Sequence, residues 1–80
     1  MNNSQQMLEA LEQQDLSKAE SFFQKALDED SDEVLLELAA YLEGIGFYPQ
    51  AAQIYEKLAP KFPEVYINLA AIAGEDGLIE

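Results

Sequence analysis

The densest group of carboxylate side chains in this 80-residue sequence is the run from Asp28 to Glu33, in which five of six residues are acidic. Asp28, Asp30 and Asp32 have the spacing of the first, third and fifth ligands of a helix-loop-helix calcium site. Such a loop also needs Gly at its sixth position and a bidentate Glu at its twelfth, and the sequence has Glu33 and Ala39 there. The run therefore predicts a solvated, capped loop between two helices and no metal site.

Carboxylate pairs elsewhere could in principle act as a general acid and a general base. Glu9 with Glu12 and Glu33 with Glu37 have suitable spacing, but such a pair needs a pocket that raises one of the two pKa values. Both pairs lie on polar faces, and the chain contains no Cys and no His. No thiolate nucleophile or thiolate metal ligand is therefore available, and the commonest general base and metal ligand, His, is absent; we predict a protein that is not an enzyme and binds no cofactor.

The charge of the chain is strongly one-sided. Sixteen acidic residues against four lysines give a formal net charge of −12 at pH 7. A field of this sign repels phosphate backbones and anionic lipid headgroups, so nucleic acid and membranes are not expected partners. A basic or amphipathic protein segment fits the charge better. No signal peptide or membrane span is visible, which predicts a cytoplasmic location.

The sequence repeats itself. One constant shift superimposes an apolar pattern on a later one, placing Ala19, Phe22, Phe23, Lys25, Ala26 and Leu27 on Ala51, Ile54, Tyr55, Lys57, Leu58 and Ala59. A nearly equal shift places Leu35, Leu38, Ala39, Ala40, Leu42 and Gly46 on Tyr66, Leu69, Ala70, Ala71, Ala73 and Gly77. Two alternating units therefore recur, as in repeat proteins.

Each unit has apolar residues at steps of three and four, which is the spacing of an amphipathic helix. We predict five helices, near residues 4–14, 17–28, 32–44, 49–60 and 64–75. Asp30 with Glu33 resembles a capping box for the third helix, and Ser31 is the alternative cap. Gly and Pro residues mark other ends: Gly44, Gly46, Pro49, Pro60 and Pro63.

These residues resemble the tetratricopeptide repeat, whose pattern of about 34 residues is W-x2-L-G-x2-Y, then A-x3-F and a closing P. The match here reads Leu35-x2-Leu38-Ala39-x2-Leu42, Gly46, Ala51-x3-Tyr55, Leu58 and Pro63, with partial copies at Ala19-x3-Phe23 and Tyr66-x2-Leu69-Ala70. The chain departs from the pattern where Ala replaces the helix-one Gly, where Leu35 and Tyr66 replace Trp, and in its slightly shorter period. The resemblance implies an all-α fold of helix-turn-helix repeats forming a right-handed α-solenoid. It divides residues 1–80 into a capping repeat (1–30), a second repeat (31–63) and an incomplete third (64–80).

Small residues have a packing role in this interpretation. Ala39, Ala51 and Ala70 are expected where two helices approach closely, while Phe23 and Tyr55 fill the gap between neighbouring units. A large residue in place of these alanines is expected to overpack.

The resemblance also implies a function. First helices of such repeats line a concave groove that holds a peptide or protein segment, without catalysis. The groove positions in this sequence are Leu8, Leu11, Glu12, Leu36, Ala40, Glu43, Ile67, Ala71 and Glu75. Leu36 and Ile67 lie beside the main apolar stripes, and their alternative role is additional core packing.

The last residues suggest a continuation of the repeat. Gly77, Leu78 and Ile79 match Gly46, Phe47 and Tyr48, so a sixth helix is expected to begin there and the chain to be the N-terminal fragment of a longer repeat protein. Without that helix the apolar face of Leu69, Ile72 and Ala73 would lack cover, which predicts self-association through it.

Two other functions stay open. Asp30-Ser31 before a helix resembles the phosphopantetheine site of acyl carrier proteins, with Ser31 as the attachment point, although that motif has Leu where Asp32 stands here. The repeats could also serve only as a structural or oligomerisation element.

Overall fold

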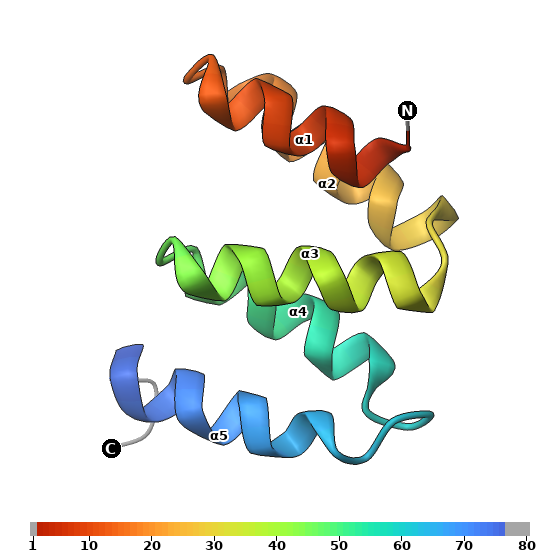
Figure 1. The fold of residues 1–80 in the computed structure, drawn as a ribbon, viewed down its shortest axis with the longest axis vertical. Coiled ribbons are helices and arrows are strands. Elements are labelled where there is room, and N and C mark those ends of the chain that lie inside the picture. Colours follow the sequence, from red (N-terminus) through yellow and green to blue (C-terminus); the bar gives the residue numbers. More distant parts are fainter. Residues whose placement is uncertain (1, 77–80) are drawn as a thin grey trace. The chain divides into compact units, whose positions relative to one another are not determined.

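A computed structural model describes residues 2–76, with side chains described as far as Ile72. These residues form α-helices and no strands, which confirms the all-α prediction. The five helices are α1 (Asn3–Glu12), α2 (Leu16–Glu29), α3 (Asp32–Gly44), α4 (Tyr48–Leu58) and α5 (Val65–Asp76) (Figure 1). Each begins and ends close to its predicted bounds. The chain divides into two compact units, Met1–Leu35 and Leu36–Glu80.

In the first unit, α1 packs against α2. The stripe of α1 that becomes buried is Met7 and Ala10, at 3% and 1% exposure. On α2 the buried residues are Ala19, Phe23 and Ala26, at steps of four and three. Helical spacing therefore places each set on one side of its helix, and three residues of the α2 repeat pattern, Ala19, Phe23 and Ala26, are core residues.

The start of α1 is held by two sets of polar contacts. Asn2 and Gln5 form a capping box, in which the Gln5 N–H donates to Asn2 Oδ1 (2.8 Å) and the Asn2 N–H donates to Gln5 Oε1 (3.0 Å). Across the unit, Asp30 Oδ2 accepts from both the N–H (2.9 Å) and the hydroxyl (2.8 Å) of buried Ser4. These bonds satisfy backbone donors that the first helical turn leaves unpaired.

Asp30 does not cap α3, so the predicted capping box of Asp30 with Glu33 is wrong. Ser31, the alternative, is the residue that caps α3: its Oγ accepts from the Val34 N–H (3.3 Å). The Asp30 carboxylate instead accepts hydrogen bonds from Asn3 and Ser4, which are the first two residues of α1. A carboxylate near a helix N-terminus is also favoured by the helix dipole, and Asp30 accepts from the backbone N–H of Ser4 in the first turn of α1.

Burial tends to raise the pKa of Asp30, but hydrogen bonds from Ser4 and Asn3 outweigh it and lower the pKa below its ordinary 3.8. A depressed carboxyl pKa stabilises the fold above the unfolded-state pKa, and this contribution is lost as the pH falls through the folded-state value. We therefore expect Asp30→Asn to destabilise the protein by about 1–2 kcal/mol at pH 7. The difference from wild type should shrink below pH 3.8. Urea denaturation followed by circular dichroism measures both, and a difference that is independent of pH would contradict an ionic role for Asp30.

Helices α1 and α3 end in the same way. At the end of α3 the Phe47 N–H donates to the Leu42 carbonyl (2.9 Å) and the Gly46 N–H to the Glu43 carbonyl (3.3 Å). This is the Schellman motif, and Gly46 has the positive φ of 91° that it requires. The end of α1 has the same pair of bonds, with Gln14 at φ 61°. Sequence reasoning extended α1 to residue 14 because Gln14 is not a residue that usually ends a helix.

The second unit contains the rest of α3 together with α4 and α5, and α4 packs against α5. Pro49 lies in the first turn of α4, where no backbone N–H is needed. The buried stripe of α4 is Ala51, Ile54, Tyr55 and Leu58, none more than 2% exposed. It reproduces, one repeat later, the buried stripe of α2, so the two helices use equivalent positions for their cores.

Candidate partner-binding site

The predicted groove residues of the first unit lie on α1. Leu8 and Leu11 are half-buried and Glu12, the last residue of the helix, is exposed. The two leucines are one turn apart on the same side of the helix. Part of each side chain is therefore accessible, next to an acidic group.

In the second unit, α3 carries three predicted groove residues at steps of four and three. Leu36 is half-buried, Ala40 is exposed and Glu43 is half-buried. This spacing puts them on one side of the helix, opposite to the buried residues Leu38 and Leu42. The side is mildly apolar, with one carboxylate at its end.

Helix α5 carries an exposed large apolar residue among the predicted groove positions. Ile67 is 76% exposed and Ala71 is exposed one turn further on. Ile67 is therefore not an additional core residue, while the half-burial of Leu36 leaves that alternative open for Leu36. The side chain of Glu75 lies outside the described residues.

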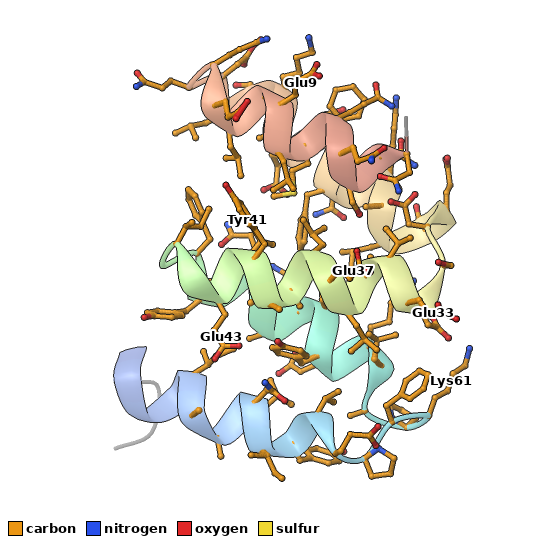
Figure 2. The ribbon with its side chains drawn as sticks, in the orientation of Figure 1. Glu9, Glu33, Glu37, Tyr41, Glu43 and Lys61 are labelled. Atoms are coloured by element: carbon orange, nitrogen blue, oxygen red, sulfur yellow. The ribbon has the colours of Figure 1, made fainter. Side chains whose placement is uncertain are left out.

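Among the predicted groove residues, Glu43 accepts a hydrogen bond from a neighbouring helix. The buried Tyr55 of α4 donates a hydrogen bond from its hydroxyl to Glu43 Oε1 (3.1 Å). In Figure 2 the Glu43 side chain leaves α3 on the side on which α5 lies. Sequence reasoning assigned Tyr55 to packing alone. The hydrogen bond that it missed orients the carboxylate of Glu43, one of the predicted groove residues.

Burial, together with the hydrogen bond to Glu43 and the negative charge of Glu43, raises the pKa of Tyr55 from 10.0 to about 12. A raised phenol pKa stabilises the fold fully below pH 10, and the contribution is lost as the pH rises toward 12. We expect Tyr55→Phe to cost about 1 kcal/mol at pH 7. Above pH 10 the wild type should lose stability faster than the variant. Denaturation curves at a series of alkaline pH values test this, with tyrosinate absorbance as the direct readout. Parallel loss in both proteins would contradict the assignment.

The apolar face of Leu69, Ile72 and Ala73 was predicted to lack cover. This is wrong for Ile72, which is 1% exposed, whereas Leu69 is half-buried. Ala73, the third member of that face, lies outside the described side chains. The exposed side of α5 is instead formed by Tyr66 (60% exposed), Ile67, Ala70 and Ala71. The prediction is wrong for Ile72 because α5 is apolar almost all the way round, so that the sequence pattern does not show which side packs; self-association through the C-terminal face stays a prediction.

The residues considered for catalysis or metal binding have other surroundings. Glu9, Glu33 and Glu37 are labelled in Figure 2 and are exposed, as is Glu12. In the part of the chain that the structure describes, no three acidic residues are grouped to hold a metal ion. Ser31, the residue considered for phosphopantetheine, is exposed and accepts the capping bond from Val34. None of the described helices has the length and hydrophobicity needed to span a membrane.

The accessible side chains of the described residues can make apolar contacts and can pair with basic groups through their carboxylates. The accessible groups are aliphatic and aromatic side chains on α1, α3 and α5, with carboxylates beside them. The chain matches no known family model, curated protein or solved structure.

Proposed function

We propose that the protein is a helical-repeat interaction module of the tetratricopeptide type, with its helix pairs stacked in a right-handed α-solenoid, and that it binds a protein segment without catalysis. The repetition of burial supports this. Ala19, Phe23 and Ala26 of α2 are buried, and so are Ala51, Tyr55 and Leu58 at the equivalent positions of α4. Sequence units with equal core positions are expected in an array of stacked hairpins.

The observation that carries the binding function is the exposure of Ile67. Ile67, at 76% exposure, adjoins Tyr66 at 60% and the exposed Ala70 and Ala71, and an exposed apolar patch of adjoining residues, unlike a single exposed side chain, is typical of an interaction surface. Ile67 and Ala71 are groove positions in the tetratricopeptide pattern. Leu36 and Ala40 are the equivalent positions on α3, and both are at least partly accessible.

The charge favours a basic or amphipathic segment as the partner. The chain has a net charge of −12, and the groove positions supply Glu12, Glu43 and Glu75 and no basic residue. Tetratricopeptide proteins that capture a C-terminal carboxylate use Lys, Arg and Asn, none of which stands at these positions. Opposite charges would raise the association rate more than the affinity.

The test compares proteins recovered from a cell extract by wild type and by the double variant Leu36→Glu, Ile67→Glu, using quantitative mass spectrometry. A matched control, Ser21→Glu with Gln53→Glu, adds the same two charges at exposed positions of α2 and α4. We expect the groove variant to recover at least about tenfold less of the specific partner, a loss of about 1.4 kcal/mol, and the control to match wild type. Circular dichroism establishes that all three are folded. Equal recovery by both variants would leave a structural or oligomerisation role as the better explanation.

A further inference from the structure

Two glutamates of α3, Glu37 and Glu43, have different surroundings. Glu37 is exposed, whereas Glu43 is half-buried and accepts a hydrogen bond at Oε1 from the hydroxyl of Tyr55 (3.1 Å). Figure 2 shows the two side chains leaving α3 on different sides, with Glu43 on the side on which α5 lies. Tyr55 is only 2% exposed and is part of the core of α4. The carboxylate of Glu43 is therefore oriented by a buried residue, while solvent surrounds that of Glu37.

The bond from Tyr55 orients the charge of Glu43 but does not neutralise it. Burial, together with Glu43, raises the pKa of Tyr55 to about 12, so that its hydroxyl is a neutral donor at pH 7. A carboxylate has about four acceptor sites, and one neutral donor leaves capacity for others. Opposite charges also attract more strongly beside partly buried groups than in bulk water. The ligand group that best complements Glu43 is a positively charged donor.

The apolar neighbours of Glu43 on α3 indicate what accompanies this donor. Leu36 and Ala40 precede Glu43 by seven and three residues, which places all three on one side of the helix. Leu36 is half-buried and Ala40 is exposed, so that an apolar side chain can be laid against them. Leu36 and Glu43 are about 10 Å apart along the axis of α3. An extended segment covers this distance in about three residues.

We propose that Glu43 is a specificity-determining residue of the groove positions, and that it pairs with one Arg or Lys side chain of the bound segment. An apolar residue of that segment, about three positions away, lies against Leu36 and Ala40. Tyr55 is a positioning residue, because it acts on the ligand only through Glu43. The inference rests on the proposed function as an interaction module, and it adds the residue that selects the basic group and the spacing of the sequence it selects.

The probe is a phage-displayed library of random peptides of about twelve residues, which span roughly 40 Å when extended. It is panned against wild type, Glu43→Gln and Glu37→Gln. The amide oxygen of Gln can still accept the bond from Tyr55, so that Glu43→Gln removes the charge and leaves the contact between α3 and α4. The two variants have the same net charge, which makes any general attraction of basic peptides equal. Circular dichroism establishes that all three proteins are folded.

We expect wild type and Glu37→Gln to enrich peptides with a basic residue at a constant spacing from an apolar one, and Glu43→Gln not to do so. Anisotropy titrations then compare the most enriched peptide with its neutral counterpart, in which citrulline replaces Arg or norleucine replaces Lys. Wild type and Glu37→Gln should prefer the basic peptide by about tenfold. Glu43→Gln should bind both peptides with the same affinity.

Three results would overturn this role of Glu43: basic residues enriched equally by Glu43→Gln, a preference lost equally in both variants, or wild-type binders without a basic position. Each of them would leave the proposed function in place, because wild type would still bind peptides. A library that yields no binder of wild type would instead count against both the proposed function and this inference. The two failures are therefore distinguishable within one experiment.

Discussion

Replacing Phe23 by Ala is expected to lower the free energy of unfolding by about 3–5 kcal/mol. Phe23 is completely buried in the middle of α2. Its removal costs the transfer energy of the ring and leaves a cavity that the surrounding close-packed side chains fill only in part. A protein of 80 residues has a total stability of roughly 4–12 kcal/mol, so most of the margin should disappear. Thermal and urea denaturation followed by circular dichroism measure the loss.

Phe22 supplies the matched control, because it is the same residue type on the same helix. It is only half-buried, and the Lys25 ammonium lies 5.4 Å from its ring centroid. Truncation of a partly exposed ring with a surface cation–π contact should cost about 1 kcal/mol. If Phe22→Ala were as damaging as Phe23→Ala, the orientation of α2 described above would be incorrect.

The second large effect is expected from Ala39→Leu, at about 3 kcal/mol of destabilisation. Ala39 is 0% exposed, and the larger side chain of Leu cannot enter a well-packed core without displaced side chains or backbone. Ala70 is the equivalent position one repeat later and is exposed. Ala70→Leu should therefore change stability by no more than about 0.5 kcal/mol. The two substitutions are chemically identical, and only their surroundings differ.

The comparison is made by urea denaturation of both variants beside wild type. A difference of about 2.5 kcal/mol between the variants follows from the two estimates above. Similar destabilisation by both would show that Ala70 is covered in solution, for example by a second copy.

How far the sequence predicts the candidate site depends on the residue. Ile67 is predicted either as a groove residue or as an additional core residue, and its 76% exposure excludes the core role; because α5 is apolar on most sides, the sequence alone does not decide between the two. The bond from Tyr55 to Glu43 was not predicted. A Tyr at a core position packs equally well with or without a polar partner at its tip, so its spacing carries no signal for the hydroxyl.

Local sequence is enough to establish which segments are helical and, nearly everywhere, where they end. Apolar spacing is a local property, and so are the requirements of Pro49 for a first turn and of Gly46 for positive φ. The pairing of Asp30 with Ser4, the capping of α3 by Ser31 and the choice of the exposed side of α5 arise only when the chain is folded. Asp30 and Ser31 are both of a residue type that is preferred at a helix N-cap, and α5 is apolar on both its buried and its exposed side. In each case the choice depends on which distant donors or side chains the fold brings close, and residue spacing along the chain does not contain that information.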